Sequence, residues 1–197
     1  MRDERSKTIA LVCHCVLNQN AKIEGIARYP GTFRPVVEQL LAADVGIYQL
    51  PCPEMTFFGI SRWSAVKDQY SSPFFKRHAQ SLADRIVDEL EDYKRRGYRV
   101  LCVIGMNGSP ACGVDLTPQA AEEPWGGRIP GVPNRRLVSD KGTFMEVLGE
   151  VLDARGLGDV PFIGLPEVAE AGDLGSALSR VEALLQDRTA ECNVHEG

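Results

Sequence analysis

Cysteines are the residues of this chain whose type and spacing could do chemistry. Cys13 and Cys15 open the segment CHCVLNQNAK, Cys52 stands in PCPE, and Cys112 stands in SPACG. Each segment follows an apolar run, so thiols that are distant in sequence can converge, which is what a soft metal centre needs. Structural zinc fits poorly, because it takes four ligands and usually draws them from C-x₂-C pairs. Three thiolates fit a [4Fe–4S] cluster that leaves one iron open to a substrate.

Other polar groups accompany these cysteines. Glu54 beside Cys52 could act as a general acid or base, and the hydroxyl of Ser109 could orient a substrate or relay a proton. Glu54 could equally cap a helix, and Ser109 before proline could begin a turn. The amides of Asn18, Gln19 and Asn20 could bind the polar edge of a heterocycle or close an Asx-type turn.

The surrounding pattern predicts the elements that must position these groups. Apolar runs at 8–13, 45–50, 99–105 and 160–165 are typical of buried parallel strands. Helical spacing separates them, most clearly after Ser72 and Pro73 and up to Gly97. We therefore expect one α/β domain over residues 1–197, a three-layer, Rossmann-like sandwich with a mostly parallel sheet. Such sheets bind ligands beyond the carboxyl ends of their strands, where the cysteine segments leave them.

Two parts of the chain depart from this pattern. Residues of about 107–140 form a glycine- and proline-rich insertion, in which Trp125 and Arg128 could cover a substrate or belong to a surface loop. The tail, about 189–197, is expected to be frayed, which makes Cys192 and His195 bystanders. Cys102 lies among aliphatic residues and is expected to be a core residue.

Composition excludes several classes of protein. The net charge of −5 and the scattered basic residues argue against a nucleic-acid-binding surface. The charged N-terminus and the short apolar runs predict neither a signal peptide nor a membrane span. We expect a cytoplasmic protein whose cysteines serve metal binding, catalysis or packing. The oligomeric state is left open.

Three short motifs resemble a known family. CVLN after the first strand, CPE after the second and SPACG after the third are similar to the signature segments of the 2-thiouracil desulfidase family, and the opening CHCVLNQNAK resembles a divergent subgroup of it. The similarity follows the order of elements over residues of about 8–165. Asn18 replaces a glycine, Ala111 replaces a serine, and the loop at 125–136 has no counterpart.

The resemblance implies a site and a reaction. Cys15, Cys52 and Cys112 would hold a [4Fe–4S] cluster, Glu54 would be the catalytic acid/base, and Ser109 would be its hydroxyl partner. The residue pattern, apart from the resemblance, predicts that Cys13 is the last buried strand residue or a nearby thiol that could tune the site, and that His14 is structural. The activity implied is a non-redox desulfidation that releases hydrogen sulfide from a small sulfur-containing substrate, such as a thiouracil-like heterocycle.

Two other readings use the same cysteines. A non-catalytic iron–sulfur or thiol module could sense oxidants or carry sulfur to a partner. A metal-free enzyme could use Cys112 as its nucleophile, although the sequence offers no convincing histidine base. A cavity lined by Glu54 and Ser109 favours the desulfidase, whereas an exposed site without a pocket favours the sensor or carrier.

Overall fold

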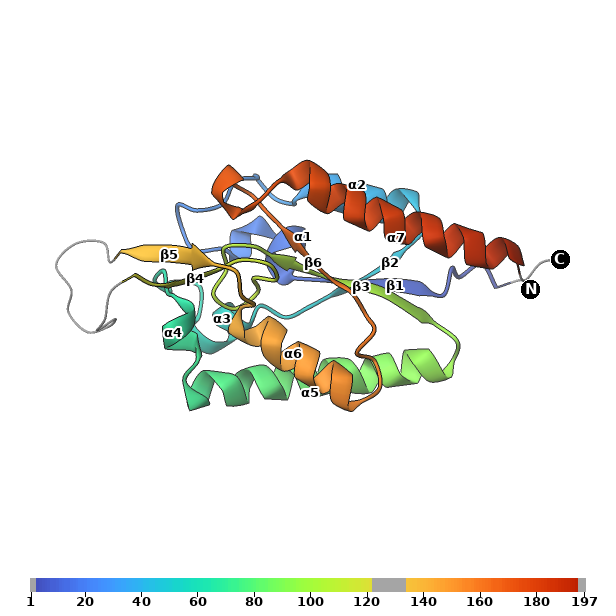
Figure 1. The fold of residues 1–197 in the computed structure, drawn as a ribbon. Helices are drawn as coiled ribbons and strands as arrows, with labels where there is room; N and C mark the ends of the chain where they lie inside the picture. The colour runs from blue at the N-terminus through green and yellow to red at the C-terminus, as the bar shows by residue number, and fades with distance from the viewer. Residues whose placement is uncertain (1–2, 122–133, 195–197) are drawn as a thin grey trace.

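A four-stranded parallel sheet forms the centre of the molecule (Figure 1). The structure, a computed structural model, describes residues 3–121 and 134–194. The strand order is β2-β1-β3-β6, and every neighbouring pair is parallel. The strands are β1 (Thr8–Val12), β2 (Gly46–Gln49), β3 (Arg99–Met106) and β6 (Phe162–Leu165).

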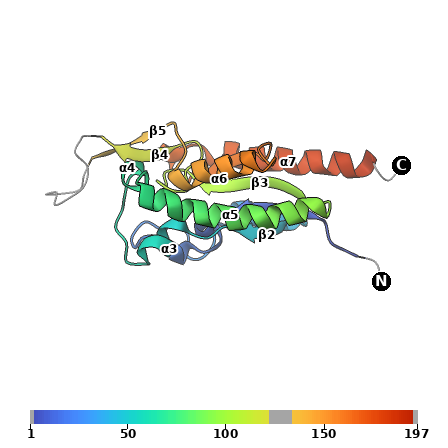
Figure 2. The same cartoon turned by 90° about the horizontal axis from the view of Figure 1, so that it is seen from below.

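Helices cover both faces of this sheet. On one face lie α2 (Arg34–Ala42) and α7 (Leu174–Val194), and on the other α5 (Pro73–Arg95) and α6 (Thr143–Ala154) (Figure 1). Figure 2 shows α5 and α6 side by side beneath the sheet. The expected three-layer, mostly parallel α/β domain is confirmed.

Local chemistry explains the helix that the sequence marks most clearly. The hydroxyl of Ser72 accepts a hydrogen bond from the backbone N–H of Phe75 at 3.3 Å, and Pro73 occupies the first turn, where its missing N–H costs nothing. Gly97 follows the helix at φ +76°, a conformation that glycine adopts without strain. The start and the stop of α5 were both predicted.

The shorter elements gather at the carboxyl ends of the strands, opposite the chain termini (Figure 1). They comprise α1 (His14–Leu17), η1 (Gln19–Ala21), α3 (Pro53–Phe58), α4 (Lys67–Tyr70), β4 (Thr117–Ala120), β5 (Arg135–Val138) and η2 (Ala169–Ala171). The chain runs from β1 to β2 on one side and to β3 on the other, so the winding direction reverses between β1 and β3. That reversal is where open α/β sheets bind ligands.

Two expectations about irregular segments need correction. The insertion at 107–140 was expected to be a loop, but it contains β4 and β5, which pair as an antiparallel hairpin. Trp125 and Arg128 lie outside the described residues. The tail was expected to fray from about residue 189, whereas α7 continues to Val194, and His195 lies outside the described residues. Among the described residues, no helix is long and apolar enough to cross a membrane.

Candidate active site

Three cysteines from three strand ends line one cavity at the carboxyl edge of the sheet. The cavity has a volume of about 460 Å³, and its walls include Cys15 after β1, Cys52 after β2 and Cys112 after β3. Glu54 and Ser109 line the same cavity. The structure therefore brings together all five residues that the sequence assigned to cluster binding and catalysis.

The chain leaves the sheet earlier at Cys13 and Cys15 than the apolar run suggests. β1 ends at Val12, and Cys13 precedes α1 with its N–H bonded to the carbonyl of Ile104 at 2.9 Å. This turn places Cys15 in the first turn of α1, at the cavity wall. The two sulfur atoms lie 3.7 Å apart, and Cys13 is buried beneath Cys15.

Cys13 and Cys15 differ in their surroundings. The contact with Cys13 and the positive charge of Lys22 lower the pKa of the Cys15 thiol, against the opposing effect of burial. The contact with Cys15 and burial raise the pKa of Cys13. Because the thiolate is the form that binds metal, Cys15 is the better ligand of the two.

His14, the residue between them, points elsewhere. Its Nδ1 lies 2.9 Å from the amide nitrogen of Gln49, and His14 does not line the cavity. Burial lowers the pKa of this imidazole. This agrees with the expectation that His14 is structural.

Cys52 stands at the start of a short helix. It is the N-cap of α3, its sulfur accepts a hydrogen bond from the N–H of Met55 at 3.4 Å, and Pro53 begins the helix. Its carbonyl accepts a hydrogen bond from the hydroxyl of Thr56 at 2.8 Å. Burial raises the pKa of the Cys52 thiol to about 11. The cap therefore fixes this sulfur at the cavity wall.

Cys112 is held by a tight turn over residues 109–113. Its carbonyl accepts a hydrogen bond from the N–H of Met106, and its own N–H donates to the hydroxyl of Ser109 at 2.9 Å. Gly105 permits this approach, because a Cβ there would lie 2.5 Å from the carbonyl oxygen of Cys112. Gly142, before α6, packs equally close on Ala111. Glycines in β3 and before α6 thus seat the turn that carries Cys112.

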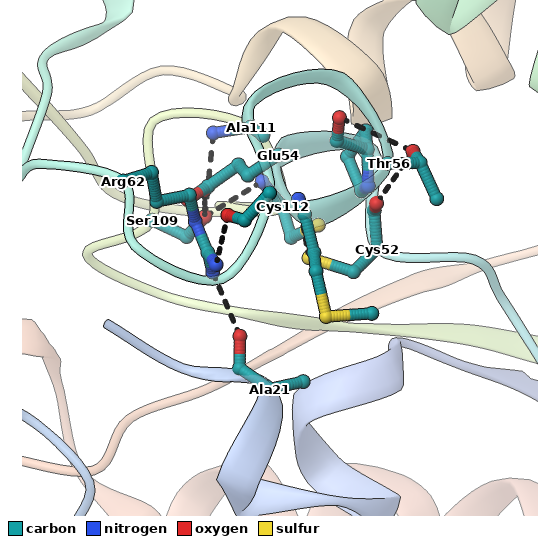
Figure 3. A network of polar contacts seen from close by, with 11 residues as sticks. Ala21, Cys52, Glu54, Thr56, Arg62, Ser109, Ala111 and Cys112 are labelled. Carbon is teal, nitrogen blue, oxygen red and sulfur yellow. Dashed lines mark hydrogen bonds and ion pairs between the residues drawn. The ribbon is translucent and has the colours of Figure 1, made fainter. Parts of the chain in front are cut away.

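Glu54 and Ser109 are hydrogen-bonded to each other. The Ser109 hydroxyl donates to Oε1 of Glu54 at 3.2 Å, while Oε2 of Glu54 pairs with Nε of Arg62 at 3.2 Å. Arg62 also donates to the carbonyl of Ala21 at 2.8 Å, as Figure 3 shows. Both charged side chains are almost fully buried, at 10% exposure for Glu54 and 5% for Arg62. The carboxylate therefore has a fixed orientation at the cavity wall.

The donor set fits a cluster held by three thiolates. Cys15, Cys52 and Cys112 are free thiols, and thiolates are the ligands that iron–sulfur clusters take. Among the described side chains of residues 3–121 and 134–187, no three from His, Cys, Asp or Glu come close enough together to bind a single metal ion. This is compatible with a polynuclear cluster, whose irons occupy separate corners and spread their ligands apart. Burial raises the pKa of Cys112 well above its ordinary value, so iron bound there would have to displace a proton.

The predicted substrate amides lie outside the cavity wall. Asn18 and Asn20 are exposed, and the side-chain oxygen of Asn18 accepts hydrogen bonds from the N–H and the side-chain amide of Asn20. This is the Asx-type turn that the sequence left as the alternative. Gln19 is buried, and its amide donates to the carbonyl of Cys15 and to Glu167, each at 2.8 Å. Gln19 thus supports two cavity residues.

Sequence reasoning missed the charged residues around the thiols and Glu54. The cavity wall includes Lys22, Arg62 and Glu167 as well as Arg28, Arg135 and Glu170, and Lys22 pairs with Glu167. Lys22, Arg62 and Glu167 stand in loops, and Lys22 and Glu167 lie 145 positions apart in the chain. Lys22 ends the segment CHCVLNQNAK, and Glu167 follows β6 as Cys15 follows β1. This position directly after a strand was the only feature of the sequence that could have placed Glu167 at the cavity.

Comparisons with known proteins identify a relative. No family model and no solved structure matches the chain. Over 110 residues the chain is 37% identical to the "Uncharacterized protein MJ0003" of Methanocaldococcus jannaschii, and the match covers 56% of this chain and 70% of that protein. The chain therefore belongs to the same protein family as MJ0003.

Proposed function

We propose that this protein is an iron–sulfur-dependent, non-redox desulfidase that removes sulfur, as hydrogen sulfide, from a small thiolated compound such as a thiouracil-like heterocycle. One observation carries the proposal: three thiols and the Glu54–Ser109 pair line the same cavity. The motifs CVLN, CPE and SPACG, which resemble those of the 2-thiouracil desulfidase family, point to the same activity. The proposal includes a cytoplasmic setting, where free thiols persist.

Cys15, Cys52 and Cys112 would hold a [4Fe–4S] cluster. The cluster, when bound, would supply a Lewis acid and a sulfur-accepting iron. The chain itself contributes a cavity whose volume suits a small heterocycle and an almost fully buried carboxylate.

Glu54 would act as the general base and Ser109 would hold it in place. A water molecule at Glu54 would lose a proton to the carboxylate and add its oxygen to the thiocarbonyl carbon. The Ser109 hydroxyl donates a hydrogen bond to Glu54 and accepts one from the backbone N–H of Cys112. These two hydrogen bonds would link the base to a cluster ligand. Arg62 pairs with the second oxygen of the carboxylate and fixes its orientation.

Substitution of Glu54 tests this function. Anaerobically reconstituted protein should release sulfide from 2-thiouracil, and Glu54→Gln should lower the rate about 100-fold, the scale of general acid–base catalysis, without loss of iron. Glu146→Gln is the matched control, since Glu146 also pairs with a buried cation, Lys67, but lies outside this cavity. A loaded cluster that releases no sulfide from thiocarbonyl compounds would favour the non-catalytic sensor or carrier instead.

A further inference from the structure

Lys22 is a positively charged residue of the cavity wall with no role in the reaction proposed above. Its side chain is only 9% exposed, it lines the cavity wall, and its ammonium pairs with the equally buried Glu167. Burying two charges costs free energy, which their mutual attraction offsets only in part. A contact that only held the loops of Lys22 and Glu167 together would not require two buried charges.

The surroundings hold Lys22 on the Cys15 side of the cavity. The amide of Gln19 bonds both to the carbonyl of Cys15 and to Glu167, so the ion pair and the predicted cluster ligand share one support. Glu54 and Ser109 belong to the Cys52 and Cys112 side. The cavity wall therefore carries both the carboxylate of Glu54 and the ammonium group of Lys22.

Burial and the nearby acidic groups shift the pKa of Lys22 in opposite directions. Burial, the largest effect, lowers the pKa of its ammonium, and the charge of Arg28 acts the same way. The acidic groups of Cys15, Cys13 and Glu54 oppose this effect. An ammonium group whose pKa is lowered gives up its proton more readily.

We propose that Lys22 is a second catalytic residue, which donates a proton to the sulfur atom of the substrate as its bond to carbon breaks. This inference rests on the proposed desulfidation. That reaction requires two proton transfers, one from the attacking water and one to the departing sulfur, and Glu54 and Lys22, which both line the cavity, provide a group for each.

The reaction balances without an oxidant or a reductant. Overall, the thiocarbonyl and one water give the carbonyl and hydrogen sulfide. The water oxygen forms a bond to carbon while one electron pair of the carbon–sulfur double bond moves to sulfur, and the two protons of the water leave, the first to Glu54 and the second to solvent. The C–S bond breaks with its electron pair going to sulfur, which takes one proton from Lys22 and a second from solvent. Solvent then returns a proton to Lys22 and removes one from Glu54.

Lys22→Arg separates proton donation from ion pairing. Arginine keeps the charge and can pair with Glu167, but its pKa is too high for it to give up a proton. With 2-thiouracil as the probe, we expect kcat to fall about 100-fold while KM, iron content and the binding of 2-thiouracil to iron-free protein stay unchanged. In Lys22→Ala, added methylamine should restore sulfide release in proportion to its concentration.

Lys67→Arg is the matched control. Lys67 has the same 9% exposure and is also ion-paired, with Asp140 and Glu146, but it lies outside the cavity. Its kcat should equal that of the wild type. Wild-type kcat in Lys22→Arg, or no methylamine rescue in iron-loaded Lys22→Ala, would overturn the role of Lys22 alone. If the loaded wild type itself released no sulfide, the proposed function would fail first.

Discussion

Two neighbouring thiols at the end of β1 have different roles in this account. Cys15 lines the cavity beside Lys22, whereas Cys13 lies buried beneath it with its sulfur 3.7 Å away. Among the cysteines whose side chains the structure describes, only Cys15 has a thiol pKa lowered by its surroundings. We therefore propose the second cysteine of CHC as the cluster ligand.

Alanine at each position tests this assignment. After anaerobic reconstitution, Cys13→Ala should keep close to the four irons of the wild type, and Cys15→Ala should lose them together with the visible absorption of the cluster. Iron and acid-labile sulfide are counted on the same samples. Equal iron in both variants would show that Cys15 is not the ligand that decides cluster binding.

The buried pair of Glu54 and Arg62 should matter to stability as well as to catalysis. Arg62→Met leaves the carboxylate without its cation, so we expect the free energy of unfolding to fall by about 3 kcal/mol in urea titrations of iron-free protein. Asp88→Asn, which breaks an exposed pair with Arg155, should change it little. Equal effects of the two substitutions would contradict the burial described here.

At the scale of elements, β3 and the start of α6 pack closely against the turn at 109–113, which carries Cys112. Gly105→Ala would place a Cβ 2.5 Å from the carbonyl oxygen of Cys112 and 2.6 Å from Val114. We expect a loss of about 2 kcal/mol in stability, together with less iron after reconstitution, because the turn must shift. Gly31→Ala, whose Cβ would meet open space, should change neither quantity. Full iron binding in Gly105→Ala would show that the close packing of Gly105 on Cys112 is not needed for cluster binding.

The elements also show what the sequence could and could not predict. β1 and most of β3 and β6 were predictable because they are buried and read as apolar runs, and α5 carries its own start and stop residues. β2 is partly exposed at the sheet edge, and the apolar run from 45 to 50 still marks it. The convergence of Cys15, Cys52 and Cys112 follows from strand ends alone. The hairpin of β4 and β5 was missed because Pro118 and the exposed arginines of β5 give no alternating pattern.

The charged pairs of the cavity were not predictable for a different reason. Lys22 pairs with Glu167, and Arg62 reaches Glu54 and the carbonyl of Ala21. The contacts of Lys22 with Glu167 and of Arg62 with Ala21 depend on how loops from different strands meet, and no local pattern encodes that. Arg62 lies eight positions after Glu54, in the irregular segment that follows α3. The sequence thus identified the thiols and Glu54 but not the charges around them.

At the scale of the whole molecule, the raised pKa of a buried core thiol predicts how the free energy of unfolding depends on pH. Burial raises the pKa of Cys102, in β3, to about 12, above its ordinary value of 9.0. The folded state therefore keeps a proton that the unfolded state loses, and stability present below pH 9.0 declines as pH rises toward 12. For iron-free protein, this thiol should contribute a loss of roughly 2 to 3 kcal/mol by about pH 11.

Cys102→Ala isolates that contribution. The variant should be less stable at neutral pH because of the cavity it creates, yet its free energy of unfolding should fall less steeply above pH 9.0. Urea titrations of both proteins at several alkaline pH values measure the two slopes. Parallel slopes would mean that Cys102 does not titrate on unfolding as described.

We propose that the three thiols brought together by this fold hold a cluster on which sulfide release depends. The most direct test measures sulfide released from 2-thiouracil by one preparation, first free of iron and then after anaerobic reconstitution. We predict no release without iron and release that rises with cluster content up to about four irons per chain. Sulfide release at the full rate from the iron-free protein would contradict the account.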